Sequence, residues 1–177
     1  WLTASVGGVS VGIVHGDAQS LAGWGFAQEH LAQAPGREQA RDWFELAGVH
    51  AFACSHTCLP VFQGIRRRAQ PGLGWVFNNG AAGMPNFRGD AAGLLTRIAT
   101  TAFAGSQRRT GTMLGAGLGA VPGAVFADAI AIEVDAAQVQ QAFLAQWPAS
   151  SDAHVSYFGR IQTGPDYHPH QVIRLED

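Results

Sequence analysis

The pattern of apolar and polar positions in the first half of the chain predicts the order strand, helix, helix, strand, which indicates an α/β fold. Leu2–Val6 and Val9–Val14 flank a Gly-Gly pair and predict a β-hairpin. Val49–Cys54 has the length and apolar character of a buried strand, and it ends in a polar turn closed by Pro60. We expect this strand to pair in parallel with Val9–Val14.

Two helices are predicted between these strands. Apolar residues at helical spacing indicate a first helix that ends near Leu31, and Asp17 or Ser20 can cap its start. A second helix covers roughly Arg37–Ala47 and stops at Gly48, a residue type favoured after helix ends. The positions at helical spacing in the first helix are Leu21, Trp24, Gln28 and Leu31, and we expect this face to lie on a sheet. Ala34-Pro35-Gly36 should then break the helix.

The rest of the chain predicts further strands and two more helices. Asp135 can cap a helix that runs to Trp147, and Asp152 lies in the first turn of a last helix that ends at Gly164. The inward residues of the helix after Asp135 are expected to be Val139, Phe143 and Leu144. Strands are predicted at Val61-Phe62 as an edge, at Leu73–Phe77, and at Phe126–Val134 as an antiparallel or edge strand.

The composition favours one ordinary folded domain and excludes several classes of function. Of the 177 residues, 47% are hydrophobic and 14% are charged, which is enough apolar material for a core. A net charge of −2 offers no field for nucleic acid or anionic lipid, and glycine and proline interrupt the apolar stretch Thr110–Val134 too often for a membrane span. Gly115, Gly117 and Gly119 lack the spacing of a dinucleotide fingerprint. We therefore expect no nucleic acid, membrane or nucleotide cofactor as a partner.

The two cysteines, Cys54 and Cys58, indicate a reduced compartment. In an extended segment their Cα atoms lie about 13 Å apart, too far for a disulfide bond. No charged segment followed by an apolar leader opens the sequence. We therefore expect a cytoplasmic protein.

The residues with metal-ligand chemistry follow predicted strands. His15 comes directly after Val9–Val14, and His56 and Cys58 follow the second buried strand. Two residues apart in an extended segment, His56 and Cys58 face the same side, and imidazole and thiol are typical zinc ligands. Parallel pairing of the two strands would place His15 and His56 at the same carboxyl edge of one sheet. Three histidines near the C-terminus are interpreted as structural or exposed residues instead: His154, His168 and His170.

Three segments together resemble the last blocks of the calcineurin-like metallophosphoesterase superfamily. They are His15-Gly16-Asp17, then Cys54-Ser55-His56-Thr57-Cys58-Leu59-Pro60, then Phe77-Asn78-Asn79-Gly80-Ala81-Ala82-Gly83-Met84-Pro85. In that family a histidine at a strand end is followed by Gly-His-Thr-His and then by an Asn-Pro-Gly-Ser-like turn. The order, the strand-end positions and the separations agree over roughly Val9–Pro85.

The resemblance implies a four-layer α/β/β/α sandwich with two divalent metal ions, Mn, Zn or Fe, at the sheet edge. It implies a phosphoric-ester substrate, attacked in line by a hydroxide that bridges the ions. His15 and His56 would ligate one metal, and Cys58 takes the place of the family histidine that serves the other. A thiolate at Cys58 would favour softer ions such as zinc or iron.

The chain departs from the family pattern upstream of His15. The family's Asp-x-His, Gly-Asp and Gly-Asn-His blocks do not precede this histidine, which has only fourteen residues before it. We therefore expect residues 1–177 to be a single domain that forms the C-terminal part of a metallophosphoesterase. Its dinuclear centre would be incomplete and its activity alone very low. The substrate and the oligomeric state have no readable signal.

Two alternatives from other classes of function remain. Cys54, His56 and Cys58 could form a small structural metal site in a scaffold module, although tetrahedral zinc requires four ligands. Cys58 could instead be the nucleophile of a hydrolase, with His15 or His56 as its base. A thiol enzyme would be blocked by alkylation and indifferent to chelators, whereas a phosphoesterase would show the reverse dependence.

Overall fold

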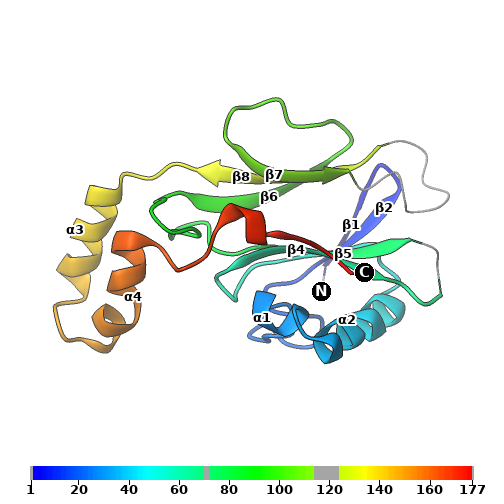
Figure 1. Ribbon diagram of the computed structural model, residues 1–177, viewed down its shortest axis with the longest axis horizontal. Coiled ribbons are helices and arrows are strands. Elements are labelled where there is room, and N and C mark those ends of the chain that lie inside the picture. Colours follow the sequence, from blue (N-terminus) through cyan, green and yellow to red (C-terminus); the bar gives the residue numbers. More distant parts are fainter. Residues whose placement is uncertain (1, 70–71, 114–123, 177) are drawn as a thin grey trace.

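The structure, a computed structural model, describes residues 2–69, 72–113 and 124–176 (Figure 1). The three glycines excluded as a dinucleotide fingerprint, at 115, 117 and 119, lie outside these residues. Within the described ranges, no helix is long and apolar enough to cross a membrane. The elements are β1 (Leu2–Val6), β2 (Val9–Ile13), α1 (Gln28–Leu31), α2 (Ala34–Ala47), β3 (Ala51–Cys54), β4 (Pro60–Arg66), β5 (Leu73–Asn79), β6 (Gly93–Ala99), β7 (Arg108–Met113), β8 (Phe126–Ile132), α3 (Ala136–Gln146), α4 (Asp152–Thr163), a 3-10 turn η1 (Pro169–Gln171) and β9 (Ile173–Leu175).

The larger sheet has six strands in the order β1-β2-β3-β5-β4-β9. The predicted hairpin is confirmed, because β1 and β2 pair antiparallel across Gly7 and Gly8, whose positive φ angles of 56° and 86° suit a tight turn. The predicted parallel pairing of β2 with β3 is also confirmed, with Val11 opposite Ala51. Strand β4 lies between β5 and β9, so the prediction that this segment forms an edge strand is wrong.

Helices α1 and α2 cover one face of the six-stranded sheet (Figure 1). Helix α2 extends the predicted second helix by one turn, because Pro35 lies in its first turn, where proline is tolerated, and does not break it. It ends at Gly48, which adopts the predicted left-handed C-terminal conformation with a φ of 63°. Side chains from the helices and from the facing side of the sheet form one core: Phe26, Leu31, Ala40, Trp43, Phe44, Val49, Phe52, Cys54, Val61, Ile65 and Val76.

A second sheet, with the order β6-β8-β7, packs on the opposite face of the six-stranded sheet. Strand β8 is antiparallel to both neighbours, as predicted, but it is the middle strand and not an edge. The described residues therefore form three layers, helices, six-stranded sheet and three-stranded sheet, and the α/β class is correct. The core between the two sheets contains Val9, Val11, Ala51, Phe62, Trp75, Phe77, Phe87, Leu94, Val125, Ala127, Ala129, Tyr167 and Val172.

The predicted first helix is largely wrong, since only the single turn α1 is helical. The preceding segment is a loop organised by Asp17, whose carboxylate accepts hydrogen bonds from the backbone amides of Gln19, Ser20 and Gly25 at 2.9–3.0 Å. Asp17 thus stabilises a turn and does not cap a helix. Because the chain bends here, Leu21 is 78% exposed, although helical spacing predicted that it would face the sheet.

Helices α3 and α4 form a hairpin that projects from the sheets (Figure 1). Both helices are confirmed: Asp135 caps α3 through the amides of Ala137 and Gln138, and Ser151 caps α4. Of the three residues predicted to face inward, Val139 and Phe143 are half-buried, whereas Leu144 is 41% exposed, and no residue of α3 is fully buried. The reason is that α3 packs chiefly on α4, where the Phe143 and Phe158 rings stack.

Candidate functional site

His15 and His56 meet at the carboxyl edge of the six-stranded sheet. His15 follows β2 and His56 follows β3, and the parallel pairing continues beyond the strands, with the amide of Ser55 donating to the carbonyl of His15 at 3.1 Å. The two side chains lie 3.2 Å apart, measured from His56 Nδ1 to His15 Nε2. The expectation that these imidazoles converge at one sheet edge is therefore confirmed.

The distance between the two ring nitrogens suits a shared metal ion. Nitrogen ligands bind zinc at about 2.0–2.1 Å, so two of them on one tetrahedral or octahedral ion lie about 2.8–3.4 Å apart. His15 and His56, at 3.2 Å, fall within that range, with each ring presenting one nitrogen to the other. His15 is exposed and His56 is half-buried, so the pair is accessible from solvent. In the structure this contact is a hydrogen bond between the two rings, and the same spacing also fits two ligands of one divalent cation.

Trp24 borders the histidine pair, and sequence reasoning had assigned it to a sheet-facing helix. Its ring lies edge-to-face against His56, with 5.8 Å between the ring centroids. The indole is nevertheless 57% exposed, although it belongs to a residue type that is usually well covered. Its position comes from the Asp17 loop, which carries it to the edge of the sheet. A periodicity argument could not find this placement, because the segment is not helical.

Cys58 lies in the same turn as His56 but makes a different contact. His56 and Cys58 both have positive φ angles, 50° and 65°, so the segment is a strained turn and not the extended stretch assumed from the sequence. The thiol of Cys58 donates to the carbonyl oxygen of His56 at 3.2 Å. Among the described residues, no group of three or more His, Cys, Asp or Glu side chains is arranged to hold a metal. A ligand role for Cys58 stays a prediction.

Cys54 does not contribute to the candidate site. It belongs to the core beneath the helices, and its side chain is 4% exposed. Burial raises the pKa of its thiol, and the negative charge of Asp17 raises it further. This environment opposes the thiolate that a structural zinc site would need. Both cysteines are free, as the sequence predicted.

Asn78 forms hydrogen bonds to three segments around the site, those that contain Phe26, Thr57 and Gly80. Its fully buried side-chain amide donates to the carbonyl of Phe26 at 2.9 Å and to the hydroxyl of Thr57 at 2.6 Å, while its oxygen accepts from the amide of Gly80. The Asn-Gly turn in the sequence signalled a turn at this point. It did not reveal that the asparagine side chain positions the loop next to His56.

Arg160 connects helix α4 to the same turn. Its Nη2 donates to the carbonyl oxygens of Cys58, at 2.6 Å, and Pro85, at 2.8 Å, and its Nε also donates to Pro85. Burial lowers the pKa of Arg160, and the nearby Cys58 opposes that shift. The sequence placed this arginine within a predicted helix, where no local pattern indicated a contact with the site.

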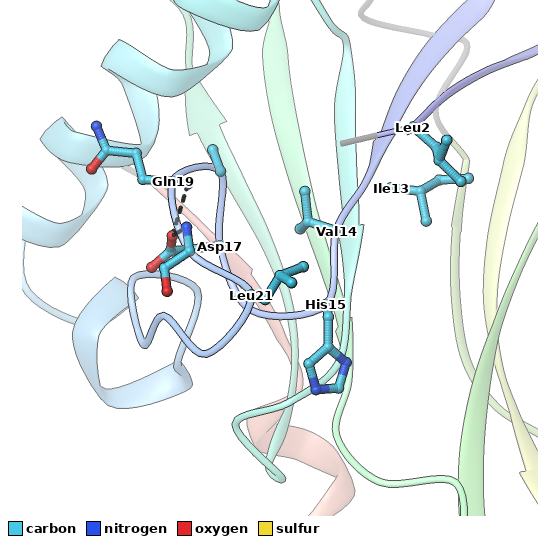
Figure 2. Close-up of a pocket in the computed structure, with 9 residues that line it drawn as sticks. Leu2, Ile13, Val14, His15, Asp17, Gln19 and Leu21 are labelled. Carbon is cyan, nitrogen blue, oxygen red and sulfur yellow. Dashed lines mark hydrogen bonds between the residues drawn. The ribbon is translucent and has the colours of Figure 1, made fainter.

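Two cavities flank the Asp17 loop. One, of about 680 Å³, adjoins His15 and is bordered by exposed apolar side chains, including Leu2, Ile13 and Leu21 (Figure 2). The other, of about 600 Å³, lies beside Trp24. Both volumes fall in the range of small-molecule sites, about 300–1,000 Å³.

The C-terminal histidines lie away from the pair formed by His15 and His56. His154 stacks on Phe158, with ring centroids 4.7 Å apart, which is a structural contact within the hairpin. His168 and His170 are exposed, as predicted, and their rings stack on each other. Neither of these two contacts supports a role in the candidate site.

Comparison with known proteins leaves the site to be interpreted from its own geometry. No protein-family model, curated protein sequence or solved structure matches this chain. The features available are the paired imidazoles, the adjoining Trp24, and the turn that Asn78 and Arg160 hold.

Proposed function

We propose that this chain is part of a metal-dependent phosphoesterase of the calcineurin-like type. One observation carries the proposal: His15 and His56, from parallel neighbouring strands, present ring nitrogens 3.2 Å apart at the carboxyl edge of a sheet. Open α/β sheets bind ligands at this edge. Paired neutral imidazoles are common ligands of divalent transition metals.

In this proposal His15 and His56 ligate one of two divalent ions, Mn, Zn or Fe. Bound ions would supply a nucleophile derived from water and would neutralise charge on the phosphoryl oxygens. His15 and His56 would hold the cation through Nε2 and Nδ1, the atoms that face each other. Cys58 stands beside them as the candidate ligand of the second ion. Among the described residues no third side chain is arranged with this pair to hold a metal, so the chain alone should bind metal weakly and hydrolyse phosphoesters very slowly.

The layer arrangement supports the same assignment. Helices, a six-stranded sheet and a three-stranded sheet are stacked in that order in the described residues. We propose that these three layers belong to the four-layer α/β/β/α sandwich of that superfamily. The fourth layer would then cover the free face of the three-stranded sheet.

The test is a cobalt(II) titration of the chain, followed by visible absorption and calorimetry. The wild-type chain should bind the ion, and His15→Ala and His56→Ala should each weaken binding about tenfold or more, because each removes one of few ligands. Cys58→Ser should remove the thiolate-to-cobalt absorption band if Cys58 is a ligand. Activity of the extended protein toward an aryl phosphate, lost in His56→Ala, would connect this site with hydrolysis.

A double variant of the other histidine pair, His168→Ala with His170→Ala, is the matched control. Those rings also stack but lie on the C-terminal segment, so their removal should leave the cobalt affinity unchanged. The proposal fails if His15→Ala and His56→Ala bind cobalt as the wild type does. Inactivation by alkylation of Cys58, with no effect of chelators, would favour a thiol hydrolase instead.

A further inference from the structure

The cavity beside Trp24 is the second concave surface at this edge of the molecule. It has a volume of about 600 Å³ and lies between the Asp17 loop and the two helices. Trp24 forms part of its wall and at the same time contacts the ring of His56. Trp24 therefore joins the wall of the cavity to the histidine pair. The wall also includes Glu29, His30, Gln33, Gln39 and Trp43.

Trp24 is much more exposed than Trp43, the other tryptophan in the wall of the cavity. Its indole is 57% exposed, whereas Trp43, in the same wall, is 4% exposed and packs against Phe26. The loop that presents Trp24 is fixed by the hydrogen bond from the Gly25 amide to Asp17, at 3.0 Å. A large ring held in place with a free face is suited to stacking on another planar ring.

The polar groups of the wall suit a neutral ligand that carries N–H donors. Glu29 supplies a carboxylate, and Gln33 and Gln39 supply amides, each with an oxygen that accepts hydrogen bonds. The Gln39 oxygen lies 3.0 Å from His30 Nε2, so this part of the wall is already ordered. None of the described residues that line the cavity is an arginine, and the sequence contains no lysine. The carboxylates of Asp17 and Glu29 belong to the same lining and disfavour a phosphate or another anion.

We propose that the Trp24 cavity binds the leaving group of the phosphoester, and that this group is a nucleoside whose base stacks on Trp24. The inference rests on the proposed function for its link to hydrolysis, because the phosphoryl group would then lie at His15 and His56. Binding of the base itself depends only on Trp24 and on the neutral and acidic side chains of the cavity wall. Adenine and cytosine, which carry amino donors, match the carboxylate and amide oxygens of the wall.

The experiment titrates the chain with adenosine and, separately, with ribose, in the presence of a chelator, using saturation-transfer NMR and tryptophan fluorescence. Adenosine should bind and ribose should not, because the base supplies the stacking surface. Trp24→Ala should weaken adenosine binding about tenfold, and Trp24→Phe should retain most of it. Trp147→Ala is the matched control, because Trp147 is also exposed, at 43%, but lies at the end of α3, and this variant should bind like the wild type.

The chelator separates this test from the test of the metal site. Nucleoside binding without metal supports the cavity assignment even if His15 and His56 bind no cation. The cobalt titration tests the metal site in the absence of any nucleoside. The proposal is overturned if adenosine does not bind, if ribose binds equally well, or if Trp24→Ala binds as the wild type does. An equal loss in Trp147→Ala would overturn it as well. If Trp24→Ala does not fold, Trp24→Leu, which keeps an apolar side chain without a stacking face, decides between these outcomes.

Discussion

The guanidinium of Arg160 donates a hydrogen bond of 2.6 Å to the carbonyl oxygen of Cys58, 102 residues earlier in the chain. A second hydrogen bond, to Pro85, ties the same side chain to the loop that follows β5. Helix α4 is thereby attached to the strained turn that carries His56. Arg160 therefore stabilises the turn that carries His56 and is not itself a member of the histidine pair.

Replacing Arg160 with glutamine should loosen that turn. The variant loses charge-assisted hydrogen bonds in a half-buried site, so the free energy of unfolding should fall by about 1–3 kcal/mol. Urea denaturation followed by circular dichroism measures the loss. Arg88→Gln is the control, because the Arg88–Asp166 ion pair is exposed on both sides and its removal should cost less than about 0.5 kcal/mol. Equal losses in the two variants would contradict the assignment.

Asn78 and Thr57 should be energetically coupled. Asn78→Ala removes the buried amide that joins Phe26, Thr57 and Gly80, and the free energy of unfolding should fall by about 2–3 kcal/mol. Thr57→Val removes only the hydroxyl and should cost about 1–2 kcal/mol. The double variant should lose about 0.5–1.5 kcal/mol less than the sum. Strict additivity in urea denaturation would show that the 2.6 Å contact contributes nothing.

Glu176 should make the stability depend on pH in the acidic range. Burial alone would raise the pKa of this carboxyl, but hydrogen bonds from Arg41 and from the Arg66 amide bring the pKa below its ordinary value of 4.5. Because the folded-state pKa is the lower one, the ionised carboxylate stabilises the fold above pH 4.5, and this contribution is lost as the pH falls through the folded-state pKa.

Glu176→Gln should therefore cost about 1 kcal/mol at neutral pH and progressively less as the pH falls below 4.5. Urea denaturation at a series of pH values measures the difference from the wild type. Glu133→Gln, at an exposed position, should show no such pH-dependent difference. A difference between Glu176→Gln and the wild type that grew towards acid pH would have the wrong sign.

Two glycines should respond to alanine in opposite directions. A Cβ at Gly93 would lie 1.7 Å from the backbone carbonyl oxygen of Ala82, so Gly93→Ala must displace backbone and should destabilise the fold by about 3 kcal/mol or more. A Cβ at Gly159, within α4, meets nothing within 4 Å, and alanine there should stabilise the helix by about 0.5–1 kcal/mol. Thermal unfolding should show the melting temperature falling in the first variant and rising in the second.

The histidine pair could be anticipated from the sequence because its causes are local. The Gly-Gly turn, the two apolar strands and the second of the two helices between them are each visible within a short window. Parallel pairing then fixes which strand ends meet. His15 and His56 follow those ends directly, so their approach needed no knowledge of side-chain packing.

The contacts that hold the loops around His15 and His56 could not be predicted from the sequence, because they join segments that are distant along the chain. Leu21 and Trp24 have helical spacing, yet the carboxylate of Asp17 captures three amides and bends the chain into a loop. Arg160 reaches Cys58 across most of the chain, which no periodicity encodes. The apolar face of α3 was predicted to be buried, but the sequence does not state that α4 is its main partner.

The contact between His15 and His56 joins residues 41 positions apart, so it exists only while β2 and β3 are paired. The ring signals of these two histidines in NMR spectra would therefore monitor the global unfolding of the sheet. Thermodynamic linkage adds a second consequence. A cation held by both rings binds the native state in preference to the unfolded chain, so its concentration would set the melting temperature of the whole domain.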